Sequence, residues 1–231
     1  MILSELEVFH SRAYSPTRRI ALGRRTLPVE PPPGFGPLLL GGIVAVGAEE
    51  LPADDHDALL VLMAQLEHGQ RIVQPRIRNR FQTDTHGLGR TVGRLLGRGE
   101  QLHYDFEGNG SPLQMALAAT YAAGQLAASV RPRTFDVLRK ALRWRGEIGP
   151  PLVAHLAGRH GTPPLSAVAY LDPTQWALEL LGLEGTPPKR EIQRRFRRLL
   201  RDAHPDHGAQ SEGAAQRIAE LAEARRILIG T

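Results

Sequence analysis

The alternation of apolar and polar residues predicts short strands near the N-terminus and again in the middle of the chain. Residues 7–14 alternate, residues 17–30 continue in a similar way, and residues 101–110 alternate up to a Gly-Asn-Gly turn. The most apolar run, residues 34–48, is too short to span a membrane and contains several glycines and a proline. We therefore predict a buried strand there, with tight turns at its ends.

Helical spacing and capping residues predict four helices in the same part of the chain. Helix starts are indicated by Asp54 or Asp55, by Ser111, and by Thr134, while Gly69 is placed to end the first helix. The predicted helices cover residues 57–69, 111–128, 135–146 and 150–158. Together with the strands, they predict an α+β domain over residues 1–165.

A change in composition marks the end of this domain. Residues 159–173 contain Gly, paired prolines and an Asp-Pro step, which is typical of a linker. Residues 166–171 also fit a last short helix. We place the linker at residues 166–173 and a second, all-α domain at residues 174–231.

The second domain is predicted to be a short helix followed by an antiparallel helical hairpin. The short helix ends at Gly182, and the first helix of the hairpin begins near residue 189. Apolar residues in that helix are spaced four, three and four apart, which gives one buried stripe. The residues of the stripe are Ile192, Phe196, Leu199 and Ala203.

The other side of this helix is basic. Arginines recur with the same spacing about 160° away around the helix axis, so we expect them to face solvent. They are Arg190, Arg194, Arg197 and Arg201. The helix must end at His204, because Pro205 disfavours a helical residue before it. A last helix over residues 214–228 returns antiparallel to the first.

Several features of this region occur together at fixed spacing. Leu181-Gly182 ends the short helix, and Phe196 stands eight residues before a histidine. His204-Pro205-Asp206 follows in the loop, and a small residue, Ala224, lies near the end of the last helix. In this combination the segment resembles the J domain of the Hsp40 (DnaJ) co-chaperone family.

The resemblance covers about a quarter of the chain and says nothing of residues 1–165. Two positions depart from the family pattern: Ile218 stands where Phe is usual, and Arg225 where Tyr is usual. Neither lies in the loop. The zinc-binding cysteine repeats and the Gly/Phe-rich linker of full-length DnaJ are missing, which argues against general binding of unfolded clients.

The resemblance implies a co-chaperone that binds a DnaK-type Hsp70 in its ATP state and stimulates ATP hydrolysis. The Hsp70-binding residues it implies are His204, Pro205, Asp206, Arg190, Arg194, Arg197, Arg198 and Arg201. The implied core residues of the J domain are Leu181, Ile192, Phe196, Leu199, Ile218, Leu221 and Ala224. The chain itself would not be an enzyme, and its N-terminal domain would select an unknown client or a location.

Composition excludes several other classes of protein. The hydrophobic share of 42% and the charged share of 23% are ordinary for a folded protein. The absence of cysteine excludes a disulfide scaffold, a Cys-ligated zinc site and a thiol nucleophile. Because the N-terminus has no basic start and carries Glu5 and Glu7, we expect no signal peptide, no membrane partner and a cytoplasmic location.

The positive charge admits a second interpretation. Of the 29 basic residues all but Lys140 and Lys189 are Arg, a bias that we attribute to a GC-rich bacterial genome. Residues 71–98 nevertheless contain seven arginines against one acid, Asp84. Candidate anion-binding residues there are Arg76, Arg78, Arg80, Arg90 and Arg94.

This basic stretch is either an anion site, for nucleic acid or an acidic client, or a solvated helix with loops. In the first case the protein would be associated with nucleic acid and would recruit Hsp70 through its J domain. The stretch lacks the ending of a P-loop. His10, His68, His86 and His103 are scattered without ligand-like spacing, and His204 with His207 has only Asp206 nearby as a further ligand. We therefore expect no cofactor and no metal, and an enzyme in residues 1–165 is the least supported reading.

Overall fold

The chain folds into two compact units. The sheet unit comprises residues 2–163, and the helical unit comprises residues 164–231 together with Met1. The computed structural model describes residues 1–15, 18–98, 101–158, 173–203 and 211–229. The linker predicted at 166–173 and the short helix predicted at 166–171 lie almost entirely outside the described residues.

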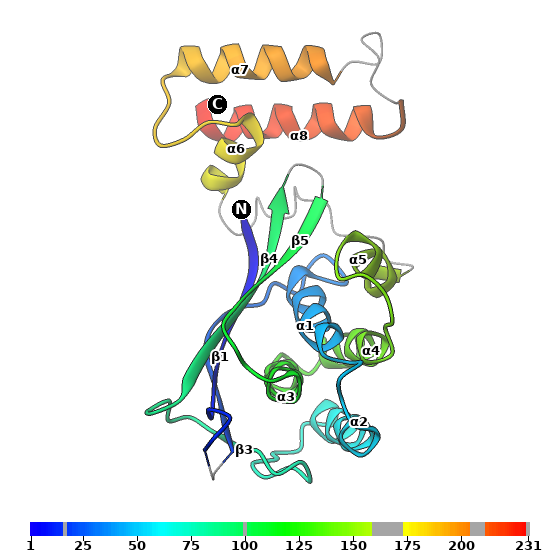
Figure 1. Ribbon diagram of the computed structural model, residues 1–231. Coiled ribbons are helices and arrows are strands. Elements are labelled where there is room, and N and C mark those ends of the chain that lie inside the picture. Colours follow the sequence, from blue (N-terminus) through cyan, green and yellow to red (C-terminus); the bar gives the residue numbers. More distant parts are fainter. Residues whose placement is uncertain (16–17, 99–100, 159–172, 204–210, 230–231) are drawn as a thin grey trace. The chain divides into compact units, whose positions relative to one another are not determined.

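The sheet unit is built on a five-stranded sheet (Figure 1). Its strands are β1 (Ile2–His10), β2 (Arg19–Thr26), β3 (Arg80–Gln82), β4 (Gly89–Arg98) and β5 (Gln101–Glu107). The order across the sheet is β3-β2-β1-β4-β5. Only β3 runs parallel to its neighbour, and the other strand pairs are antiparallel. Strand β1 is therefore the central strand, between β2 and β4.

Five helices cover one face of this sheet (Figure 1). They are α1 (Phe35–Val46), α2 (Ala53–Glu67), α3 (Pro112–Gly124), α4 (Arg131–Leu142) and α5 (Pro150–Ala157). Helix α1 contacts the sheet through β1 and β4, and it also packs against α3, α4 and α5. The unit is thus an α+β fold, as predicted for this part of the chain, with α1 at its centre.

The strand predicted at residues 34–48 is wrong, because this run forms helix α1. Eleven of its twelve residues are buried, and a short apolar run that is buried on all sides carries no periodicity to separate helix from strand. The glycines that suggested turns serve close packing instead. A Cβ on Gly42 would overlap the ring of Tyr104, and one on Gly41 would lie 2.7 Å from Leu156 Cδ1. Within the described residues, no helix combines the length and apolar character needed to cross a membrane.

The capping predictions had mixed outcomes. Ser111 is confirmed as a cap: its side chain accepts from the Gln114 N–H, and the Gln114 side chain accepts from the Ser111 N–H in return. Asp54 and Asp55 are not caps, since α2 begins after Pro52 and both acids lie in its first turn. Thr134 also lies inside its helix, where its hydroxyl donates to the Val130 carbonyl.

Residues 71–98 contain no α-helix, contrary to one of the two interpretations of this basic stretch. Residues 89–98 form β4, and a Cβ on Gly93 in this strand would lie 2.9 Å from Ile43 of α1. Because side chains alternate between the faces of a strand, Arg90 and Arg94 project from the face opposite the helices. Their charge is therefore displayed on the face of the sheet that no helix of this unit covers.

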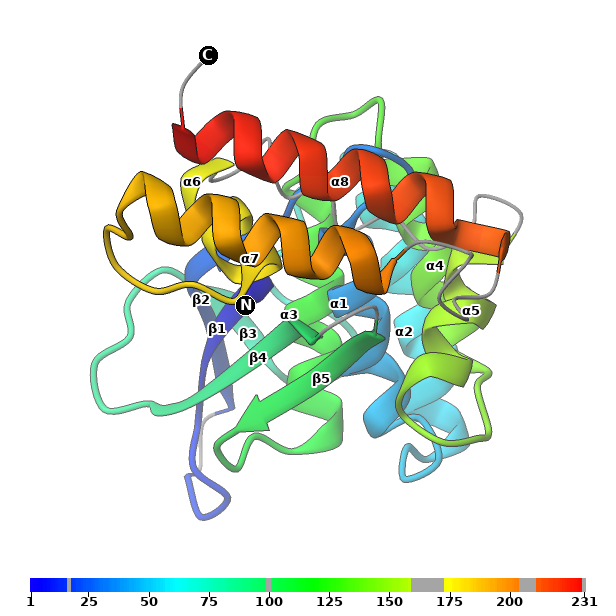
Figure 2. The same cartoon turned by 90° about the horizontal axis from the view of Figure 1, so that it is seen from above.

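The helical unit contains α6 (Pro173–Leu181), α7 (Lys189–Asp202) and α8 (Ser211–Ile229). Helices α7 and α8 lie side by side and antiparallel in both views (Figures 1 and 2), and α8 also packs against α6. Gly182 has a φ of +64°, with its N–H on the Glu179 carbonyl and the Leu183 N–H on the Leu178 carbonyl. This pair of bonds is a Schellman motif, so the predicted end of α6 at Gly182 is confirmed.

His10, at the end of β1, should make the sheet unit sensitive to acid. It is 2% exposed, and its Nε2 lies 2.9 Å from Thr91 Oγ1. Burial lowers the pKa of His10. Its neutral form therefore stabilises the fold fully above the pKa of an unfolded histidine, about 6.5, and this contribution is lost as the pH falls towards the lower folded pKa.

We expect the free energy of unfolding to fall as the pH is lowered below about 6.5, and His10→Gln to flatten this dependence. The two tryptophans lie in different units, so urea unfolding can be followed by Trp144 fluorescence in a Trp176→Phe background. The exposed His86 supplies the control, His86→Gln, which should keep the wild-type pH dependence. An unchanged pH slope in His10→Gln would contradict this assignment.

Candidate functional site

Helix α7 separates a buried side from an exposed, strongly basic side. Ile192 is 2% exposed and anchors the helix in its unit. The five implied Hsp70-binding arginines of this helix are all exposed: Arg190, Arg194, Arg197, Arg198 and Arg201. These five residues are called the α7 arginine face below. The structure thus gives every guanidinium of the set access to a partner.

Few acidic groups offset this charge. The Arg194 guanidinium lies 3.5 Å from the Glu191 carboxylate, but both side chains are exposed, and such pairs are screened and weak. Arg197 Nε donates to the Gln193 carbonyl at 3.3 Å, which leaves its charge uncompensated. The α7 arginine face therefore remains positive and suits an acidic surface.

The basic helix is fixed to α6 by an arginine that the sequence analysis did not single out. Arg195 Nε donates to the Leu181 carbonyl, the last of α6, at 2.9 Å. A guanidinium at this end of a helix is favoured by the partial negative charge of the free carbonyls. Arg195 is three residues after the buried Ile192, and this spacing is the signal that places it on the inner side.

The implied core residues of this unit differ in burial. Leu181, Ile192, Leu221 and Ala224 are buried, whereas Phe196, Leu199 and Ile218 are only partly buried. Above the Phe196 ring lies Arg225, with its guanidinium carbon 5.3 Å from the ring centroid. Arg225 is one of the two residues that depart from the family pattern, and here it joins α8 to α7 through a cation–π contact.

His204, Pro205 and Asp206 lie outside the described residues. They belong to the segment that connects the end of α7 at Asp202 to the start of α8 at Ser211. In the chain, His204 comes three residues after Arg201, the last member of the α7 arginine face.

The five candidate anion-binding arginines of residues 71–98 do not share one environment. Arg94 donates to Glu5 at 3.0 Å and to both Asp105 and Glu107 at 3.1 Å. Arg90 donates to Glu7 at 2.5 Å, and this bond together with the Arg24 N–H lowers the pKa of Glu7. Arg90 and Arg94 are therefore occupied by the acids of neighbouring strands.

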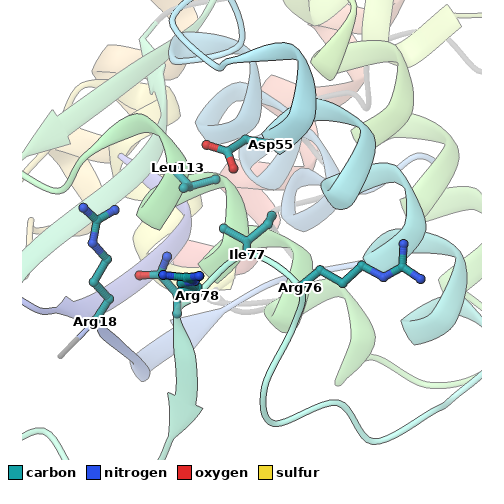
Figure 3. A pocket seen from close by; sticks show the side chains of 7 residues that line it. Arg18, Asp55, Arg76, Ile77, Arg78 and Leu113 are labelled. Carbon is teal, nitrogen blue, oxygen red and sulfur yellow. The ribbon is translucent and has the colours of Figure 1, made fainter.

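Arg76 and Arg78 instead line a pocket of about 460 Å³ in the sheet unit (Figure 3). Its lining residues are Arg18, Asp55, Arg76, Ile77, Arg78, Asn79 and Leu113. Arg80 is exposed at the start of β3 and is not among them. Ile77 and Leu113 lie between Arg18 and Arg76, and the Asp55 carboxylate approaches from α2 (Figure 3).

Asn79, like Arg18, Ile77 and Leu113, is a residue of this pocket that sequence reasoning missed. It is 1% exposed, yet its Oδ1 has no hydrogen-bond partner among the described residues. Such a buried, unpaired carbonyl costs about 1–3 kcal/mol. The loop that carries it is held by Arg80 N–H on the Arg18 carbonyl at 2.9 Å, and by Phe81 stacked on Tyr121.

The described residues contain no group of three or more His, Asp or Glu side chains arranged to hold a metal ion. A scan against protein-family models, a search of curated proteins and a search of solved structures found no match to this chain. The functional assignment therefore depends on the residues and their geometry.

Removal of Arg94 should destabilise the sheet unit. Arg94→Gln leaves Asp105 and Glu107 without their counter-charge and Glu5 with only the exposed Arg24, and we expect a cost of about 1–2 kcal/mol. The matched control is Arg24→Gln. Arg24 is 73% exposed and lies 3.8 Å from Glu5, which is too far for a hydrogen bond. The substitution should therefore cost less than about 0.5 kcal/mol. Urea unfolding followed by Trp144 fluorescence measures both, and equal costs would contradict the structural role of Arg94.

Truncation of Phe196 tests the packing of α7 on α8. Because Phe196 is only partly buried, Phe196→Ala should cost about 2 kcal/mol, less than the 3–5 kcal/mol of a fully buried ring. Arg225→Gln should cost about 0.5–1 kcal/mol through the lost cation–π contact. Trp176 is 2% exposed, so its fluorescence in a Trp144→Phe background reports unfolding of this unit. If Arg225→Gln lowers the free energy of unfolding as much in the Phe196→Ala background as in the wild type, the contact between the two side chains is contradicted.

Proposed function

We propose that this protein is a co-chaperone of a DnaK-type Hsp70. The helical unit docks on Hsp70 in its ATP state and stimulates ATP hydrolysis, and the sheet unit selects the client or the location. The observation that carries the proposal is the α7 arginine face, five exposed guanidinium groups that precede His204-Pro205-Asp206 in the chain. The chain catalyses no bond chemistry itself.

Charge complementarity supports a transient complex of this kind. The planar guanidinium donates two parallel hydrogen bonds to a carboxylate, so a row of arginines suits an acidic surface. Opposite charges on two surfaces raise the rate of association more than they raise affinity, and salt reduces the effect. Fast association combined with modest affinity suits a co-chaperone, because it must bind and dissociate within each ATP cycle.

Rigidity of the helical unit supports the proposal as well. The Arg195 bond to Leu181 ties α7 to α6, and the Arg225 contact with Phe196 ties α7 to α8. These contacts hold the backbone beneath the arginine face before any partner arrives. Less conformational entropy is then lost on docking.

The alternative of a nucleic-acid surface across residues 71–98 has weaker support. Arg90 and Arg94 already have carboxylate partners, and Arg94 has three of them. A phosphate that binds Arg90 or Arg94 would have to displace their carboxylate partners, and those carboxylates would repel its negative charge. We therefore do not propose nucleic acid as the partner of this segment.

The decisive measurement is single-turnover ATP hydrolysis by a DnaK-type Hsp70 with and without the full chain. We expect stimulation by the wild type and its loss in His204→Gln and in Asp206→Asn, with unchanged circular dichroism. The control is His86→Gln, a change of the same type at an exposed histidine of the other unit. Full stimulation by His204→Gln, or none by the wild type, would refute the proposal.

The arginine face can be tested separately from the loop. Arg194→Ala with Arg198→Ala should slow association with Hsp70 and make the rate less sensitive to salt, at a cost in stability of about 0.5 kcal/mol or less per site. Arg143→Ala, an exposed arginine of the sheet unit, is the matched control and should leave the kinetics unchanged. Stopped-flow binding at two salt concentrations distinguishes these outcomes.

A further inference from the structure

The pocket of the sheet unit contains charge that has no counterpart in the protein. Three arginines, Arg18, Arg76 and Arg78, line it together with a single acid, Asp55. Within the described part of the chain, none of these guanidinium groups forms an ion pair. This contrasts with Arg90 and Arg94, whose carboxylate partners are in place. An anion is therefore the missing partner that the pocket favours.

The same pocket also contains an acceptor that lacks a donor. Asp55 on α2 lines it and has no ion-pair partner among the described residues. A bare phosphate ion would suit the guanidinium groups, but the Asp55 carboxylate would repel its negative charge. A ligand that carries a hydroxyl or amine donor apart from its phosphate would match both kinds of group.

A third feature sets the character of the remaining part of the ligand. Ile77 and Leu113 form an apolar floor, with Arg18 and Arg76 on opposite sides of it (Figure 3). A volume of about 460 Å³ lies in the range of small-molecule sites, which combine apolar walls with a few polar groups. The floor can pack against the organic part of a ligand while the rim binds its polar ends.

We propose that this pocket binds a small organic phosphate whose organic part carries hydroxyl or amine donors, the class of nucleotides and sugar phosphates. The Arg78 guanidinium binds the phosphate, and Arg18 and Arg76, on opposite sides of the floor, add positive charge to the pocket. Asp55 accepts hydrogen bonds from the donors, and Ile77 with Leu113 packs against the carbon skeleton. This site does not depend on the co-chaperone function of the helical unit.

The test is isothermal titration of the full chain with adenosine 5′-monophosphate, ribose 5-phosphate, adenosine and inorganic phosphate. We expect one or both organic phosphates to bind, and adenosine and inorganic phosphate to bind at least about tenfold more weakly, because each offers only part of the ligand. Arg78→Gln should weaken binding by about tenfold, and Arg18→Gln with Arg78→Gln further. Arg143→Gln, which changes the net charge equally at an exposed site outside the pocket lining, should have no effect.

Asp55→Asn provides an independent readout. It keeps the shape of a side chain that forms no ion pair among the described residues, so the ligand-free variant should melt close to the wild-type temperature, while its binding of the organic phosphate weakens and its binding of inorganic phosphate does not. Absence of binding by both organic phosphates at low salt would overturn the proposal. So would equal weakening by Arg78→Gln and Arg143→Gln, or binding of single-stranded RNA but of neither organic phosphate, since each would indicate a diffuse basic surface instead of a pocket.

Discussion

The close approach of helix α1 to its neighbours is the contact on which the sheet unit depends. Gly41 and Gly42 lie next to each other in α1, where one meets Leu156 of α5 and the other meets the Tyr104 ring of β5. The Tyr104 hydroxyl also donates to the Leu38 carbonyl at 3.1 Å, which joins sheet and helix by a polar bond. A side chain at either glycine would push the helix away from the sheet or from the outer helices, and the buried core would lose contacts on both sides.

Packing of all five helices on one face leaves the other face of the sheet to polar groups. There the strands are joined by acids and arginines, with Glu5 and Glu7 on β1 opposite Arg94 and Arg90 on β4. Cross-strand pairs of opposite charge stabilise a sheet modestly and favour its register. The same arrangement removes these two arginines from the set available to a partner.

The arginines of this protein therefore fall into two groups that composition alone cannot separate. Arg90, Arg94, Arg195 and Arg225 are used inside the fold, on carboxylates, a helix end and an aromatic ring. The α7 arginine face makes only the exposed pair of Arg194 with Glu191 and the bond of Arg197 to the Gln193 carbonyl, and the arginines of the pocket form no ion pair among the described residues. The first group explains stability, and the second carries the two proposals, one for a protein partner and one for a small anion.

What the sequence by itself determined was local. The Ser111 cap, the end of α6 at Gly182 and the two sides of α7 were all predicted, because each depends on residues within one or two turns of a helix. Residues 75–80 alternate buried and exposed in the structure, and this alternation of apolar residues and arginines could have indicated an extended segment.

The tertiary structure alone decided the rest. Residues 34–48 form a helix that the sheet and three other helices surround. The sequence of this run alone does not show which elements will pack around it. Glu5 lies 89 positions from Arg94 in the chain, and Asp55 and Leu113 come to Asn79 from separate helices. Charge compensation and pocket formation depend on which distant segments meet, and local spacing contains no information about those meetings.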